Sequence, residues 1–150
     1  MIHSNLTFIR RLLLLSSGAA LFASLPSSAA TVWDAASGSD FLWSNAANWG
    51  GVEPGSGDDV ELPKPVPNPG VLADPNIIVL STGELANALS FFAPYTLTGG
   101  TLELTTGQIA VTIGNASTIE SQLTGSGGLL KLNDGALKLT NALNNYTGTT

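Results

Sequence analysis

Three tryptophans are the residues of this chain most capable of binding a ligand, and they lie close together in the sequence. Exposed indole rings stack on sugar rings, so Trp33, Trp43 and Trp49 predict a glycan-contact surface, to which Tyr95 and Tyr146 would add. In the alternative interpretation, the tryptophans cap the open end of a repetitive fold or anchor its first segment, because terminal repeats need a cap. The cap is favoured, and both interpretations stay open.

Two adjacent carboxylates are the next candidates for chemistry. Asp58 and Asp59 follow a Gly-Ser-Gly run, and a pair of carboxylates can hydrolyse a glycosidic bond that lies between them. Neighbouring residues of a strand point to opposite faces, however, and Gly and Asp are typical of tight turns. We therefore expect a turn in which one aspartate accepts hydrogen bonds from backbone amides.

A calcium site is a weaker prediction for the same region. Gly55, Gly57 and Asp59 have the spacing of a glycine-rich nonapeptide that binds calcium in repeated copies. Only one copy is present here, and Glu61 stands at an apolar position of that pattern. Carboxylates are calcium ligands, so a surface ion stays a minor alternative, held by Asp34, Asp40, Asp58 and Asp59. Our prediction is that the chain uses neither a metal nor a cofactor.

Nucleophilic catalysis has no basis in the sequence that follows residue 30. That part of the chain contains no Cys and no His, so no imidazole can activate a serine or a thiol. The sequence therefore predicts a protein that is not an enzyme. The absence of Cys also means that stability must come from burial and backbone hydrogen bonds rather than from disulfides.

The first 30 residues have the character of a secretory signal peptide. Arg10 and Arg11 precede an apolar run from Leu12 to Phe22, which is too short to span a bilayer. A Ser-Ser-Ala-Ala segment follows, and its small residues suit a signal peptidase, so we predict cleavage after Ala30, with Ala29 as the alternative. Export would place the protein outside the cell or on the outer surface of a bacterium, with the periplasm as the alternative.

Cleavage at this site would leave an acidic chain. It keeps all eleven acidic residues but only three basic ones, Lys64, Lys131 and Lys138, for a formal charge of −8. Such a surface repels nucleic acid and anionic lipid, and no second apolar stretch is long enough to cross a membrane. Nucleic acid and a membrane span are therefore not expected. Glycans, or the surface of a host or neighbouring cell, are the partners that this composition allows.

The chain divides into a leader and a repetitive part. Residues 31–75 contain the tryptophans, turn-forming Gly and Asp, and a proline-rich stretch from Pro63 to Pro75, which together predict a cap followed by a loop. Residues 76–150 contain the buried-strand run from Ile77 to Leu80 and three copies of the pattern Gly-x-Leu-charged-Leu. The leucines that this pattern places in the core are Leu102, Leu104, Leu130, Leu132, Leu137 and Leu139.

The spacing of these leucines predicts an all-β fold. Side chains alternate along a strand with a period of two, so the leucines of each copy share one face and the charged residue between them takes the other. A repeated unit that cannot bury its own apolar face must stack on a neighbour. We therefore predict a right-handed parallel β-helix, or solenoid, with Gly and Asn at its corners and threonines outside. An antiparallel β-sandwich is the alternative.

The stretch from Leu123 to Thr150 resembles the autotransporter-associated β-strand repeat. The matching residues are Gly125, Gly127, Gly128, Leu129, Lys131, Gly135, Leu137, Leu139, Asn144, Tyr146 and Gly148. The Trp43–Trp49 segment is similar to the leader of such bacterial proteins. The resemblance implies a passenger-type β-helix with a structural or adhesive role at the surface of a Gram-negative-type bacterium. Only one full repeat is present, so we expect a fragment, with further repeats or a translocator barrel elsewhere.

Overall fold

The computed structural model describes residues 29–64 and 76–150. The predicted signal peptide, up to residue 28, and most of the proline-rich stretch, residues 65–75, lie outside the described residues. One sheet consists of β1 (Thr31–Val32), β2 (Asp59–Leu62), β4 (Glu84–Phe91), β6 (Thr101–Val111), β8 (Gln122–Thr124) and β9 (Leu130–Leu132). The other consists of β3 (Ile77–Leu80), β5 (Thr96–Gly99), β7 (Ala116–Ile119) and β10 (Ala136–Leu139). A short 3₁₀ helix, η1 (Ala46–Trp49), lies between β1 and β2.

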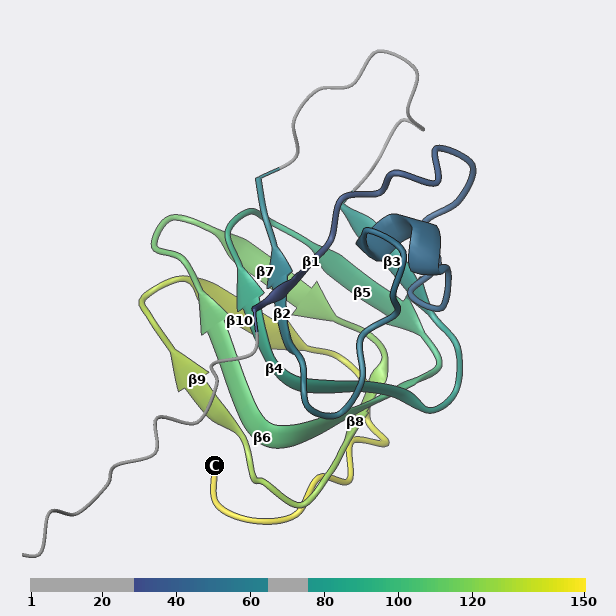
Figure 1. The fold of residues 1–150 in the computed structure, drawn as a ribbon. Coiled ribbons are helices and arrows are strands. Elements are labelled where there is room, and N and C mark those ends of the chain that lie inside the picture. Colours follow the sequence, from purple (N-terminus) through teal and green to yellow (C-terminus); the bar gives the residue numbers. More distant parts are fainter. Residues whose placement is uncertain (1–28, 65–75) are drawn as a thin grey trace, which may run out of the picture.

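Every strand pair among the described residues is parallel. The first sheet runs in the order β1-β2-β4-β6-β8, with β9 also paired to β6, and the second runs β10-β7-β5-β3. Neighbouring strands thus come from successive turns of the chain, which winds into a β-solenoid of about three turns (Figure 1). The parallel solenoid is confirmed, and the antiparallel sandwich is wrong.

The strands β4 and β6 are long because each bends through a corner of the coil (Figure 1). The register of β4 with β6 shifts between Ala86 and Ala88. On its other side, the first half of β6 pairs with β8 and the second half pairs with β9. Corners of the coil are also where side chains bind the previous turn. The hydroxyl of Thr106 donates to the carbonyl of Asn87, and the Asn115 side-chain amide donates to the carbonyl of Phe92.

The interior is filled by columns of side chains at paired positions. Val60, Leu89 and Ile109 form one column, and each is at most 1% exposed. The second sheet contributes a column of the same kind, which consists of Ile78, Leu97 and Ile119. Burial of apolar surface contributes about 25 cal/mol per Å², so the stacked columns supply the stability that disulfides do not.

Close contact between turns requires a residue without a side chain at one corner. A Cβ atom on Gly100 would come within 1.8 Å of the carbonyl oxygen of Ser81, which belongs to the previous turn. No larger residue fits at that distance unless the two turns move apart. The glycine that opens the pattern Gly-Thr-Leu-Glu-Leu is therefore a consequence of coil stacking.

Four of the six predicted core leucines face the interior. Leu102 and Leu104 are 0% and 3% exposed, as the sequence predicts. Leu137 and Leu139 stand in register with the buried residues Ser117 and Ile119. Both pack against the core, but they stay half-buried because they belong to the last coil of the described chain.

The prediction for Leu130 and Leu132 is wrong. These residues pair with Gln108 and Ala110 on the outer face, and they are 52% and 37% exposed. Lys131, between them, stands in register with the buried Ile109. All three residues of β9 are exposed, and their register with β6 has the reverse of the predicted phase. A shift of one residue exchanges the two faces of a strand.

Among the described residues, no helix has the length and apolar character needed to cross a membrane.

Candidate functional site

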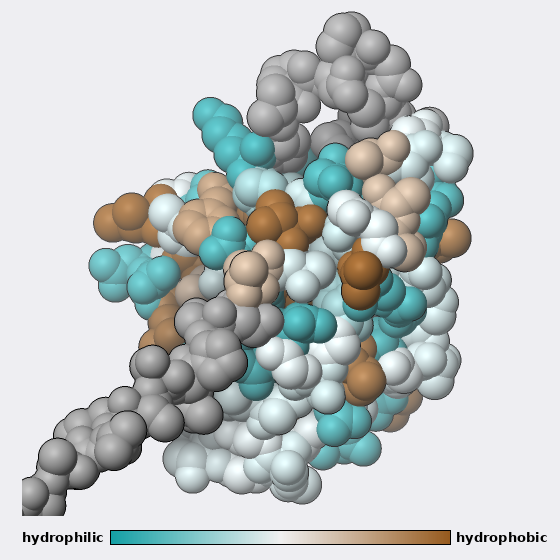
Figure 2. Space-filling view, viewed as in Figure 1, coloured by the Kyte–Doolittle hydropathy of each residue, from teal (hydrophilic) through white to brown (hydrophobic). Residues whose placement is uncertain are grey.

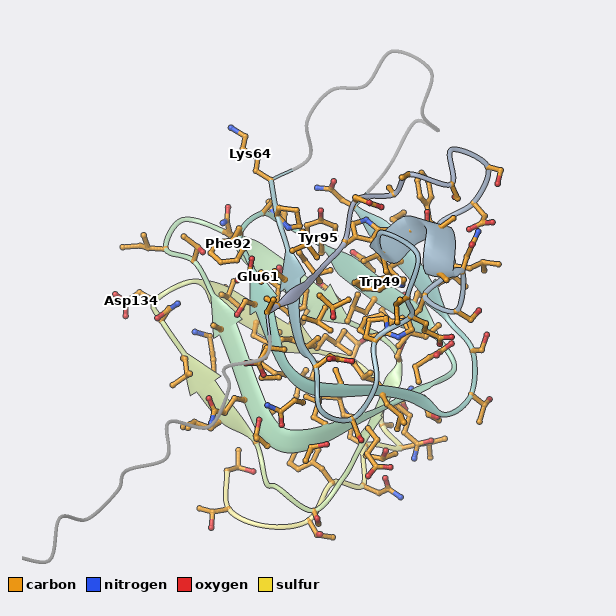
Figure 3. The ribbon with its side chains drawn as sticks, in the orientation of Figure 1. Trp49, Glu61, Lys64, Phe92, Tyr95 and Asp134 are labelled. Carbon is orange, nitrogen blue, oxygen red and sulfur yellow. The ribbon has the colours of Figure 1, made fainter. Side chains whose placement is uncertain are left out.

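The three tryptophans form a closed cluster at the N-terminal end of the solenoid. Trp33, Trp43 and Trp49 are 2%, 0% and 5% exposed. The Trp49 ring lies edge-on to both partners, with centroid distances of 4.9 Å to Trp33 and 4.8 Å to Trp43. Figure 3 shows Trp49 directed into the molecule from η1. The prediction of a glycan-contact surface at these tryptophans is wrong, because their rings are packed against one another and the core.

A polar network holds this cap in shape. The buried side chain of Asn48 in η1 donates to Asp40 Oδ1 at 3.0 Å and to the carbonyl of Leu42 at 3.1 Å, and its oxygen accepts from the amide of Ser37. The pKa of Asp40 is lowered, chiefly because its carboxylate accepts a hydrogen bond from the backbone amide of Leu42. Hydrogen bonds from the side chains of Asn45 and Asn48 lower it further. The sequence does not predict this role of Asn48, because the spacing of the residue gives no sign that it is buried.

One of the two tyrosines is buried and the other is half-buried. Tyr95 is 3% exposed, its hydroxyl donates to the carbonyl of Pro63 at 2.7 Å, and burial raises its pKa to about 12. Tyr146 is half-buried against the core. Neither residue joins the tryptophans at a common surface, so the aromatic residues do not assemble into a ligand site.

The aspartates after the Gly-Ser-Gly run have structural partners. Asp58 Oδ2 accepts from the amide of Gly55 at 2.8 Å, which closes the predicted turn. Asp59 Oδ1 accepts from the side-chain amide of Asn87 at 2.7 Å on the outer face. Across the part of the chain that the structure describes, no three acidic, His or Cys side chains are placed to hold a metal ion.

A polar groove of about 590 Å³ lies on the outer face of the first sheet. Its floor consists of outward-facing residues of β2, β4 and β6, and the chain that leads into β1 forms one wall. The lining residues are Ala29, Ala30, Asp59, Glu61, Asn87, Ala88, Ser90, Thr106 and Gln108. Figure 3 shows Glu61 beside β1 and β2, on the side of the sheet that faces the viewer. Amides, hydroxyls and two carboxylates make this surface hydrophilic. On the whole face drawn in Figure 2, hydrophilic and neutral residues predominate, with apolar residues scattered among them.

Two glutamates meet beside the cap. Glu84 is 5% exposed and occupies a core column directly above Leu102, where its Oε1 accepts from the amide of Ser81 at 3.0 Å. Glu53, which follows the cap, shares a hydrogen bond with the Glu84 carboxyl, and this contact, with burial and like charge, raises the pKa of Glu53 to about 7. The contact between the two carboxyl groups thus joins the cap to the column that contains Glu84 and Leu102.

The C-terminal end of the solenoid is open by comparison. Segment 144–147 pairs beneath β8, where the amide of Asn145 donates to the carbonyl of Leu123. The apolar side chains that point into this last coil are only partly covered, and they are Leu129, Leu137, Leu139 and Tyr146. Lys131 stands among these inward positions, and its ammonium group donates to the carbonyl of Asn133 at 2.6 Å.

Comparison of the chain with protein-family models, with curated proteins and with solved structures found no match.

Proposed function

We propose that this chain is an exported structural protein: the N-terminal end of a β-solenoid that is displayed on, or released from, a bacterial surface. The observation that carries this proposal is the difference between the two ends. Tryptophans seal the N-terminal end, whereas the inward leucines of the last coil stay half-buried. Coils of a solenoid stabilise their neighbours, so a capped end and an open end suit a segment on which further coils stack.

A filled interior supports a structural role without catalysis. The core columns contain Val, Leu and Ile side chains at 0–4% exposure, so we assign the interior to packing rather than to substrate binding. Partners such as glycans or proteins of a neighbouring cell would meet the outer faces, as in an adhesive passenger. Turnover of a polysaccharide by purified Thr31–Thr150 would contradict this part of the proposal.

The resemblance to the autotransporter-associated repeat gives further support. The segment that carries it, from Leu123 to Thr150, forms the last coil, including β9 and β10. A repeat that occupies one full coil can be multiplied without altering the coils before it. Further repeats of this kind, or a translocator barrel, are the partners we propose for the open end.

Export can be tested with the full chain in a Gram-negative host. We expect mass spectrometry of the protein outside the cytoplasm to give a chain that begins at Thr31, because the small residues before it suit signal peptidase. Leu14→Arg, which interrupts the apolar run, should leave the full-length chain in the cytoplasm. Cytoplasmic, uncleaved protein from the unaltered gene would refute the proposed export.

Coil addition can be tested by fusing a second copy of residues 123–150 after Thr150. A coil that stacks should cover Leu137 and Leu139, raise the melting temperature and slow amide exchange in β9 and β10. A tail with the same 28 residues in scrambled order is the matched control. If both tails leave exchange in β10 unchanged, the open end does not accept a coil.

A further inference from the structure

The first strand of the solenoid begins at Thr31, the first residue after the predicted cleavage site. Thr31 pairs with Val60, and Val32 pairs with Glu61. Val60 points into the core at 1% exposure, so Asp59 and Glu61 on either side of it point outward. The backbone nitrogen of Thr31 therefore lies beside the strand segment that bears both carboxylates.

Among the described residues that line the groove around these carboxylates, none is a cation. The carboxylates line the polar groove together with Ala29 and Ala30, and every other lining residue is uncharged. Asn87 binds one oxygen of Asp59. Lys64 lies beyond the far end of β2, and Figure 3 shows it directed away from Glu61. A single positive charge at the start of β1 would thus meet two carboxylates in a groove to which the described residues contribute no cation.

Cleavage would create that charge. Water hydrolyses the Ala30–Thr31 amide bond, Ala30 leaves with a carboxylate on the released peptide, and the nitrogen of Thr31 takes up a proton. An α-amino group has an ordinary pKa of about 7.7–8.0, so it is largely protonated at neutral pH. The wall of the groove made by Ala29 and Ala30 leaves at the same time.

We infer that the α-ammonium group of Thr31 binds the carboxylate of Asp59, with Glu61 as a second partner, and thereby fastens β1 to the sheet. This inference rests on the proposed export and cleavage. Strand β1 leads directly into the cap, because Trp33 follows its last residue, Val32. The amide of Trp33 donates to the carbonyl of Glu61 at 2.9 Å and so continues the pairing with β2. Removal of the signal peptide would therefore complete the cap, and the uncleaved chain would be the less stable form, as export of an unfolded chain requires.

The test uses Thr31–Thr150 released from an N-terminal fusion so that Thr31 carries a free amine. Opposite charge favours the ammonium form, so NMR titration should give the Thr31 amine a pKa above about 8.5. Asp59→Asn should return it to the ordinary range, and Glu61→Gln should lower it by a smaller amount. Glu103→Gln is the matched control, because Glu103 is an exposed carboxylate of β6 outside the groove.

The pH dependence of stability gives a second readout. A raised ammonium pKa stabilises the fold below the ordinary pKa of the amine, and this stabilisation disappears as the pH rises through the raised value. The urea midpoint of the unaltered protein should exceed that of Asp59→Asn at pH 6.5, and the two should converge at pH 10. N-terminal acetylation should have the effect of Asp59→Asn.

Two results would overturn the inference. If the pKa of the Thr31 amine is ordinary and does not change in Asp59→Asn, the ammonium group does not contact the carboxylates. Equal urea midpoints for the free and acetylated amines at pH 6.5 would show that the contact does not fasten β1. Both measurements use a chain with a defined start, so they are independent of whether the cell exports and cleaves the protein, which mass spectrometry of the exported chain decides.

Discussion

The two ends of the solenoid close their interior columns in opposite ways. At the N-terminal end, Trp33, Trp43 and Trp49 cover the first coil and are at most 5% exposed. At the C-terminal end, Leu137 and Leu139 continue the columns but stay half-buried. The first coil therefore has a large aromatic cap, whereas the inward apolar side chains of the last described coil are only partly covered.

The difference shows how the two ends of a repetitive fold can have different surfaces. A coil is stable only against a neighbour or a cap, and edge strands with unpaired backbone groups invite association with other chains. Lys131 lies at an inward position of the open end, in register with Ile109. Inward-pointing charges are one way in which natural sheets discourage such association. The open end thus combines a stackable apolar surface with one residue that limits indiscriminate stacking.

The largest loss of stability is expected when the tryptophan cap is disrupted. Trp43→Ala removes a side chain with 0% exposure that packs on Trp49, and truncation of such an aromatic residue costs about 3–5 kcal/mol. Urea unfolding should show this loss. Val52→Ala is the control at the same end, because Val52 is 72% exposed and should change stability by less than about 0.5 kcal/mol. Similar losses in both variants would mean that the cluster does not cap the core.

A pair of leucine truncations compares the middle of the solenoid with its open end. Leu102→Ala empties a fully buried site and should cost about 2–5 kcal/mol. Leu137→Ala should cost less than half of that, since its side chain already contacts water in the last coil. The free energies of unfolding from denaturant titration decide the matter. Equal costs would indicate that another surface covers Leu137 in solution, and self-association should then be visible by sedimentation.

Substitution of Lys131 tests whether its charge limits self-association at the open end. Lys131→Leu completes an apolar inward column, and burial of one leucine between two molecules contributes about 1.5–3 kcal/mol. We expect roughly tenfold tighter self-association in sedimentation equilibrium. Lys138→Leu is the matched control, because Lys138 pairs with the outward residue Thr118. If Lys138→Leu self-associates more strongly than Lys131→Leu, the surface that mediates self-association lies on the outer face instead.

Much of the fold could be predicted because period-two alternation depends on local residue types. In β6, the buried residues Leu102 and Leu104 and the exposed Glu103 follow the sequence pattern directly. The phase of β9 could not be predicted in this way. It is set by the turn that precedes the strand, where Gly128 has a φ of 78°, and the same Gly-x-Leu pattern is compatible with either phase.

The candidate sites were harder to predict because they depend on contacts between distant segments. Tryptophans suit both a glycan surface and a cap, and only the packing of Trp33 on Trp49 distinguishes the two. The side chain of Asn48 looks like any other turn residue until its partner Asp40 is known. The polar groove likewise joins residues from three strands and the entry to β1, a proximity that no single stretch of sequence contains.

The smallest change in stability is expected from the pair of Glu53 and Glu84, which joins the tryptophan cap to the column of Glu84 and Leu102. Because the pKa of Glu53 is raised from 4.5 to about 7, the stabilisation from its protonated form is complete below about pH 4.5 and disappears as the pH rises through 7. Glu53→Gln keeps a neutral donor at every pH, so its stability should stay level from pH 5 to pH 8. The unaltered protein should lose stability over that interval, by less than about 1 kcal/mol because Glu53 is exposed.

Thermal melts across this pH range measure the difference, with Glu103→Gln as a control at an exposed carboxylate on β6. The control should follow the unaltered protein. If Glu53→Gln also follows it, the two glutamates do not share a hydrogen bond, and the cap is held by its tryptophans and Asn48 alone. A level profile for Glu53→Gln only would show that the loss of stability with rising pH comes from the contact between Glu53 and Glu84 at the capped end.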